Sequence, residues 1–154
     1  MRAVVQRVSS ASVNIPEEGY SEKIGTGMVI LLGIKSGDTL NDVNFVADKC
    51  SNLRIFEDSE GKMNISIRDV NGEALIISQF TLYGEIARGN RPGFIEAAKP
   101  DEAIPLYEKF INRMKENLDG DKVKTGIFGA IMDIALVNSG PVTIIVESKN
   151  ASNN

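Results

Sequence analysis

The sequence contains no histidine and only one cysteine, Cys50. The lack of histidine excludes catalytic Ser–His and Cys–His pairs and removes the commonest metal ligand. A zinc site built from His and Cys is therefore excluded, and we expect no metal and no organic cofactor. Cys50 has no partner for an internal disulfide, and it falls on the apolar side of an expected helix, where a free cysteine packs as a small hydrophobe. An enzyme made from this chain must use hydroxyls, amides, carboxylates, Lys, Arg and backbone dipoles.

Long apolar runs are also missing. No run approaches the roughly 20 residues of a membrane span, and Gln6 and Arg7 interrupt the short run Ala3–Val5 before it resembles a signal peptide. We therefore expect no membrane partner and a cytoplasmic location. The length of 154 residues suits one domain with its own core. We place this domain at residues 1–148 and expect the Asn- and Ser-containing tail, residues 149–154, to be disordered.

Excess positive charge is absent as well, because the formal net charge is −4. This balance gives no reason to expect a DNA partner, although binding responds to the local field rather than to net charge. Arg88 and Arg91 share a loop with Gly, Asn and Pro, and Lys122 and Lys124 flank Val123. Each pair is either a phosphate contact or a pair of solvated loop charges.

Periodicity predicts mainly strands in the first part of the chain. Arg2–Val8 reads as a strand with two mostly apolar faces, and Ser9–Ile15 either forms a hairpin with it or continues it as one long bent strand. The apolar run Met28–Ile34 is typical of a central strand buried on both sides. Asn71-Gly72 predicts a hairpin turn between Ile67–Val70 and Ala74–Ile77.

Two helices are expected. The first starts near Thr39, where Asp42 completes a capping box, and the second runs from about Asp101, its predicted N-cap, to Leu118. Each carries a single apolar stripe for packing on a sheet. These stripes are Leu40, Val43, Val46, Ala47, Cys50 and Leu53 in the first helix, and Ile104, Tyr107, Phe110, Ile111, Met114 and Leu118 in the second.

Two further strands, Ile131–Val137 and Val142–Val146, are predicted near the C-terminus. The whole pattern indicates an α+β fold, with a curved and largely antiparallel sheet and two packed helices.

Two polar stretches stand at the ends of apolar strands. Ser78–Gly84 follows Ala74–Ile77, and Asn138–Thr143 follows Ile134–Val137. The first can direct hydroxyls, an amide and backbone N–H groups at a ligand without formal charge. From spacing alone, both also fit ordinary strand ends and a tight turn.

Six short motifs occur in order along the chain and together resemble the D-aminoacyl-tRNA deacylase family. The match extends from Met1 to about Ser148. The motifs are the N-terminal MRAVVQRV at 1–8, NLRIF at 52–56, GKMN at 61–64, SQFTLY at 78–83, TGxFGA at 125–130 and NxGPVT at 138–143. The resemblance implies a barrel-like sheet, a homodimer and hydrolysis of the ester bond of D-aminoacyl-tRNA.

The resemblance puts Thr81 in the catalytic position, together with Ser78, Gln79 and Phe80. An aminoacyl ester is already activated, so oriented water and an oxyanion site near the N–H groups of Phe80 and Thr81 suffice for its hydrolysis. The sequence names no base that would make Thr81 a covalent nucleophile, and we favour an orienting hydroxyl.

The resemblance also gives Gly140 and Pro141 a role in chiral selection. In the family this pair forms a cis peptide that reaches across the dimer into the partner's pocket, and Arg7 supports it. A rigid pair there rejects the L side chain by a clash and leaves glycine, which has no side chain, as a substrate. Taken alone, a Gly-Pro pair also fits a plain turn.

The family's pocket for the terminal adenosine corresponds to the segment from Gly126 to Met132, and Arg88 and Arg91 correspond to tRNA contacts. Phe128 would offer an apolar or stacking face. The pocket residues are Gly126, Phe128, Gly129, Ala130 and Met132.

The chain departs from the family pattern at Ser139 and Ile131, where Asp is frequent, and in the loop Gly84–Gly93. These changes affect tRNA contacts more than the reaction. Two alternatives stay open: a hydrolase for wrongly charged L-aminoacyl-tRNA with a trans Gly-Pro pair, and a non-enzymatic module that binds RNA ends.

Overall fold

The computed structural model describes residues 1–148. The expectation of a disordered tail at 149–154 falls outside these residues. The elements, in chain order, are β1 (Arg2–Ile15), η1 (Pro16–Glu18), β2 (Tyr20–Ile24), β3 (Gly27–Gly33), α1 (Leu40–Asn52), β4 (Phe56–Glu57), β5 (Met63–Ile65), β6 (Glu73–Ser78), η2 (Phe80–Tyr83), α2 (Pro100–Asn117), η3 (Gly120–Lys122), β7 (Val123–Thr125) and β8 (Asp133–Glu147).

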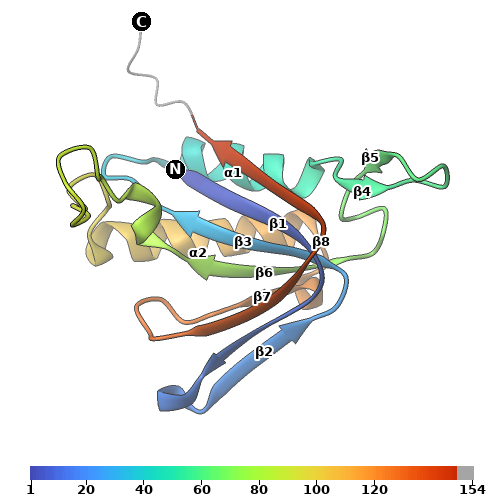
Figure 1. Cartoon of the computed structure of the whole chain (residues 1–154), viewed down its shortest axis with the longest axis horizontal. Coiled ribbons are helices and arrows are strands. Elements are labelled where there is room, and N and C mark those ends of the chain that lie inside the picture. Colours follow the sequence, from blue (N-terminus) through green and yellow to red (C-terminus); the bar gives the residue numbers. More distant parts are fainter. Residues whose placement is uncertain (149–154) are drawn as a thin grey trace, which may run out of the picture.

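A strongly curved sheet forms the body of the molecule, with the helices packed against it (Figure 1). Its path is β2-β1-β3-β6-β7, and β8 pairs with β1. The pairs made by β1 are antiparallel, whereas β3–β6 and β6–β7 are parallel. The α+β fold class is thus confirmed, and the sheet is mixed. Parallel neighbours need a crossover, which contains α1 between β3 and β6 and α2 between β6 and β7.

The sequence left open whether residues 2–15 form a hairpin or one long bent strand. Residues 2–15 form one long strand, β1, whose first half pairs with β3 and whose second half pairs with β2. Its other edge pairs with β8 along almost its whole length. One bent strand therefore joins both halves of the sheet.

The predicted hairpin at Asn71-Gly72 is wrong. A turn is present, with Asn71 at φ 51°, but residues 66–72 form turns and no strand precedes β6 as its antiparallel partner. Met63–Ile65 instead pairs with β4 in a separate two-stranded sheet. The dipeptide signals a left-handed backbone position, and it does not determine which strand β6 pairs with.

The two C-terminal strands predicted at 131–137 and 142–146 are one strand, β8, and Gly140-Pro141 lies inside it. Its pairing with β1 is irregular between Gln6 and Ser10. A bulge accommodates the Gly-Pro pair at this point, because a proline has no N–H to donate to a sheet.

The helices follow the predicted pattern, with one change at the start of the second. Thr39 N donates to Asp42 Oδ2 at 2.8 Å, as expected for the capping box. The second helix begins at Pro100 rather than Asp101, and Lys99 is its N-cap. Proline suits the first turn because its missing N–H would have no helical partner there.

Most of the predicted stripe residues are buried, including Cys50, Phe110 and Met114. Leu40 and Ile104, each at the first turns of its helix, are exposed instead. No helix within residues 1–148 combines the length and the apolar character that crossing a membrane requires.

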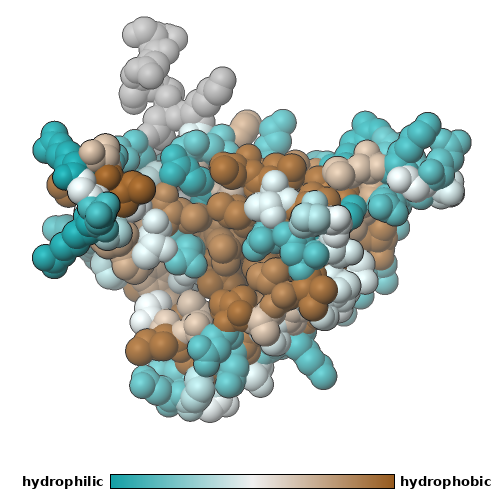
Figure 2. Space-filling model, viewed as in Figure 1, coloured by the Kyte–Doolittle hydropathy of each residue, from teal (hydrophilic) through white to brown (hydrophobic). Residues whose placement is uncertain are grey.

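Some large apolar side chains stay on the surface. Figure 2 shows apolar residues gathered in the middle of the face on which β8 crosses the sheet. Exposed large apolar side chains of β8 and its surroundings include Phe80, Ile131, Val137 and Ile145.

Candidate active site

The sheet ends in a tight turn that carries the first polar stretch. Ser78 is the last residue of β6, and η2 follows after Gln79. Gln79 N donates to the Leu32 carbonyl of β3 at 2.8 Å, and Gly84 N donates to the Thr81 carbonyl at 3.0 Å. The neighbouring strand thus fixes the start of the turn.

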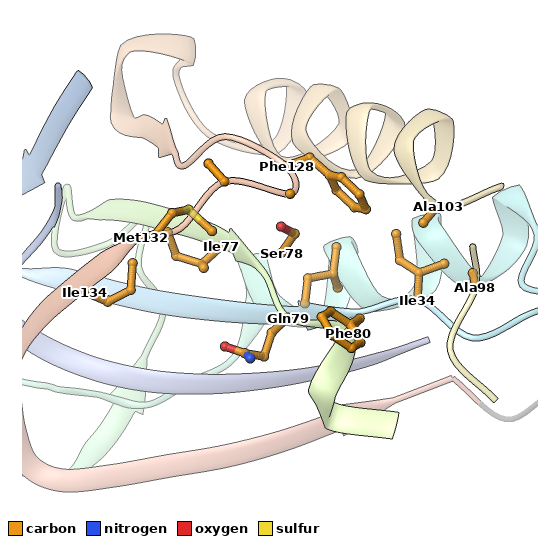
Figure 3. A pocket seen from close by; sticks show the side chains of 13 residues that line it. Ile34, Ile77, Ser78, Gln79, Phe80, Ala98, Ala103, Phe128, Met132 and Ile134 are labelled. Carbon is orange, nitrogen blue, oxygen red and sulfur yellow. The ribbon is translucent and has the colours of Figure 1, made fainter. Parts of the chain in front are cut away.

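A pocket of about 280 Å³ opens beside this turn. In Figure 3, Ser78 lies between Met132 and Phe128, and α2 passes above Phe128. The lining residues are Leu32, Ile34, Ile77, Ser78, Gln79, Phe80, Ala98, Ala103, Phe128, Gly129, Ala130, Met132 and Ile134. The structure therefore brings the end of β6 together with the segment 126–132, far away in the sequence.

The pocket is lined by neutral residues only. No Asp, Glu, Lys or Arg is among the residues that line it. Its polar groups are the Ser78 hydroxyl, the Gln79 amide and backbone groups. A side chain able to act as a general base near pH 7 is thus missing from the lining.

Thr81 is at the edge of this pocket rather than in its lining. Its Oγ1 accepts a hydrogen bond from Gln79 Nε2, which leaves the Thr81 hydroxyl proton available to a ligand. Within residues 1–148, the amide N–H groups of Phe80 and Thr81 have no hydrogen-bond acceptor, as is usual for the first residues of a short helix. These two N–H groups are free to stabilise a negative oxygen.

Contacts with β6 and α2 hold the segment 126–132 in place. Gly126 N donates to the Ile76 carbonyl at 3.1 Å, and a side chain at this position would collide with the sulfur of Met132. The Phe128 ring packs on Tyr107, with ring centroids 5.7 Å apart. The Tyr107 hydroxyl donates to the Ile76 carbonyl at 3.2 Å, and burial raises the pKa of this phenol, so it stays protonated.

Arg7, Gly140 and Pro141 form a second group, which is not part of the pocket lining. Arg7 Nε donates to the Ser139 carbonyl at 2.8 Å, and its Nη1 donates to the Ile55 carbonyl at 2.7 Å. The Gly140–Pro141 peptide bond is cis, and both residues are exposed. Gly140 has φ 135°, and an added Cβ would meet Arg7 Nη2 at 2.8 Å, so this position suits glycine alone.

Arg88 and Arg91 lie in a loop closed by two hydrogen bonds between Glu85 and Gly93, of 2.7 and 2.9 Å. Both arginines are exposed and line a separate, open cavity of about 700 Å³. Phe94 at the end of the loop packs edge-on against Phe80, with centroids 5.0 Å apart. The loop is therefore attached to the pocket through this aromatic pair.

Residues 1–148 contain no cluster of three or more His, Cys, Asp or Glu that could hold a metal ion.

A model of the family described as D-Tyr-tRNA(Tyr) deacylase matches residues 4–147. The chain belongs to this family. A D-aminoacyl-tRNA deacylase of Porphyromonas gingivalis is 53% identical over 150 residues, covering 97% of this chain and 99% of that protein. The D-aminoacyl-tRNA deacylase of Bacillus velezensis is 54% identical over 149 residues, with the same coverage. Membership of the deacylase family makes the chain a hydrolase that acts on aminoacyl-tRNA.

Solved structures agree on the deacylase fold. One titled "c-Myc DNA Unwinding Element Binding Protein" has a TM-score of 0.91 and 39% identity, covering 97% of this chain and all of that chain. Another, titled as a probable eukaryotic D-amino acid tRNA deacylase, has a TM-score of 0.82 and 16% identity, covering 96% and 98%. The second likeness concerns the fold alone.

The sequence did not indicate the other walls of the pocket. Leu32 and Ile34 lie at the end of β3 and directly after it, and Ala98 and Ala103 lie just before α2 and in its first turn. Small or aliphatic side chains at these positions look like ordinary core residues. Only the tertiary structure shows that they border the pocket.

Proposed function

We propose that this chain hydrolyses the ester bond between a D-amino acid and the terminal ribose of tRNA, releasing the free D-amino acid and tRNA. The observation that carries this proposal is the neutral pocket that joins the turn at Ser78–Thr81 to the segment 126–132. An activated ester needs oriented water and a site for the oxyanion rather than a strong base, and family membership supports the same substrate class.

The free N–H groups of Phe80 and Thr81 form the oxyanion site, and the Thr81 hydroxyl orients the attacking water. The hydrogen bond from Gln79 to Thr81 supports this role, because it fixes the hydroxyl oxygen as an acceptor and directs its proton away from Gln79. With no base in the pocket lining, the ribose hydroxyl beside the ester helps to activate water. Ser78 borders the pocket as a second hydroxyl.

Chiral selection belongs to Gly140 and Pro141 of a partner subunit in a homodimer. Their exposure and their place outside the pocket of their own chain favour a role in another subunit's pocket. Backbone at that place leaves no room for an L side chain, so the filter works by exclusion. Glycine passes such a filter, and glycyl-tRNA is therefore a second substrate. This activity is a proofreading step in translation and takes place in the cytoplasm.

The terminal adenosine binds against Phe128 and the glycines of the segment 126–132, where a close approach to the backbone is possible. Arg88 and Arg91 contact tRNA phosphates from the exposed loop. The reaction needs no cofactor. We propose no DNA partner, since the net charge of −4 gives no reason to expect one.

The test compares D-tyrosyl-tRNA, L-tyrosyl-tRNA and glycyl-tRNA as substrates of the same preparation. Loss of the D and glycyl esters, with the L ester intact, supports hydrolysis with selection by exclusion. Cleavage of both enantiomers would contradict chiral selection by Gly140 and Pro141 and still support ester hydrolysis. Binding of all three substrates without cleavage would contradict the proposed hydrolysis.

A further inference from the structure

The turn that carries Thr81 depends on a residue from the other end of the chain. The guanidinium of Arg2, the first residue of β1, reaches η2 and donates from Nη1 to the Leu82 carbonyl at 2.8 Å. Its central carbon lies 5.0 Å from the centroid of the buried Tyr83 ring, in the range of a cation–π contact. Arg2 thus contacts the two residues that directly follow Thr81.

A second contact fixes the guanidinium itself. Arg2 and Glu147 stand opposite each other in the β1–β8 pairing. Glu147 Oε1 accepts from Arg2 Nη2 at 2.8 Å and from Nε at 3.2 Å. The planar group therefore spans the carboxylate on β8 and the carbonyl of η2, a geometry that suits arginine and not lysine.

The carbonyl at Leu82 needs such a partner. A short helix leaves its last carbonyl groups without an internal hydrogen bond, so a donor from outside the turn satisfies this one. The start of the turn is held by β3, because Gln79 N donates to the Leu32 carbonyl of that strand. Arg2 holds the other end, so both ends of the turn are fixed and the N–H groups of Phe80 and Thr81 keep their direction.

We propose that Arg2 is a positioning residue for ester hydrolysis: through the Leu82 carbonyl and the Tyr83 ring it holds η2 so that Thr81 and the free N–H groups point at the substrate. This inference rests on the proposed function. Arg2 acts through the turn and contacts no substrate.

The test replaces Arg2 by Ala and uses Arg113→Ala as a matched control. Arg113 also holds a carboxylate, Asp48, through Nε and Nη2, and its side chain is 37% exposed against 34% for Arg2. The control pair links the helices far from the turn. Partly exposed ion pairs add little to stability, so both variants should fold.

For Arg2→Ala we expect kcat to fall about 10-fold, less than the 10²-fold or more that follows loss of a whole oxyanion donor. KM should change less than about twofold, because the pocket walls stay intact and the lost contacts act on the reacting geometry. Methylguanidinium should restore part of kcat, whereas methylammonium should not. Arg113→Ala should keep the kcat of the unchanged chain.

Hydrogen exchange gives a readout that does not depend on activity. The hydrogen-bonded amides of this turn, those of Gln79, Leu82 and Gly84, should exchange faster in Arg2→Ala than in the unchanged chain, and at the same rate in Arg113→Ala. Unchanged exchange in this segment, or an equal loss of kcat in both variants, would overturn the role of Arg2. If the unchanged chain cleaves none of the three esters while the segment still loosens, the proposed function fails and Arg2 remains the residue that holds the turn.

Discussion

At the scale of single residues, Thr81 decides between two kinds of catalysis. No ionisable side chain lines the pocket, and the Thr81 oxygen accepts a hydrogen bond from Gln79. An orienting hydroxyl contributes through one hydrogen bond, so Thr81→Ala should lower kcat about 10²-fold and leave measurable hydrolysis. Single-turnover assays with labelled D-tyrosyl-tRNA measure this loss.

The matched variant is Thr81→Ser, which keeps the hydroxyl and should keep most of the activity. Rapid acid quenching tests for label attached to the protein. A covalent acyl-enzyme in the unchanged chain, or complete loss of hydrolysis in Thr81→Ala, would contradict the orienting role and make Thr81 a nucleophile. Binding of charged tRNA without any turnover, equal in the unchanged chain and in Thr81→Ala, would instead favour the module that only binds RNA ends.

Cys50 shows how burial controls reactivity. Desolvation raises the pKa of this thiol from 9.0 to about 12, while a backbone hydrogen bond opposes the shift. Since only the thiolate reacts, a thiol reagent at pH 8 should label the folded chain far more slowly than the chain in denaturant. Fast labelling of the folded chain at this pH would contradict the burial.

The raised pKa of the Cys50 thiol also makes the stability of the fold depend on pH. The folded-state pKa is the higher one, so the folded thiol binds its proton more tightly than the unfolded thiol. The resulting stability is complete below pH 9 and is lost as the pH rises towards about 12. Denaturant unfolding at a series of alkaline pH values, with Cys50→Ala to identify the contribution of this thiol, measures the loss.

At the scale of elements, the loop with Arg88 and Arg91 is the part of the site most open to change. Both side chains are exposed, and Phe94 ties the loop to Phe80. If each arginine binds one phosphate, Arg88→Ala and Arg91→Ala should each raise KM. Each should also make the fall of log affinity with log salt concentration shallower, by roughly 1 in the slope. kcat should change little.

The control for this prediction is Lys62→Ala, which removes an exposed cation from the turn between β4 and β5. Binding of the tRNA measured over a range of salt concentrations gives the slopes. An equal effect of all three variants would indicate only a general loss of positive charge, and no effect would exclude the loop as a tRNA contact.

The elements also show what a single sequence can predict. α1, α2 and β3 follow from local apolar spacing and were predicted at nearly their observed positions. The hairpin at Asn71-Gly72 was wrong because the partner of β6 is the distant strand β3, in a parallel pair that no local turn encodes. The break placed at Gly140-Pro141 was wrong because a bulge lets β8 continue past a proline.

The candidate site was also predicted only in part from the sequence. The stretch Ser78–Thr81 could be recognised from its motif, and so could the segment 126–132, which the structure brings to the same pocket. Arg2 could not, because its contacts with Leu82 and Glu147 join residues 80 and 145 positions apart. Pairings of this separation depend on the whole sheet.

At the scale of the whole molecule, an open strand edge and exposed apolar side chains are the basis for expecting a dimer. β8 pairs with β1 and leaves its other edge open within the described residues, and Val137 on this strand is 56% exposed. Exposed apolar groups beside an open edge mark a contact surface. Gly140 and Pro141 lie on the same strand, so a dimer formed there would carry them towards a second pocket.

We therefore expect sedimentation to give twice the 16.7 kDa of one chain. Because the proposed filter comes from the partner, dilution that dissociates the dimer should reduce the preference for D-tyrosyl-tRNA over L-tyrosyl-tRNA in step with the dimer fraction. Val137→Lys should shift both changes to higher protein concentration by placing a charge on the contact surface, whereas Ile104→Lys on α2 should not. A monomer that discriminates fully between the two esters would place the filter within one chain and exclude selection across subunits.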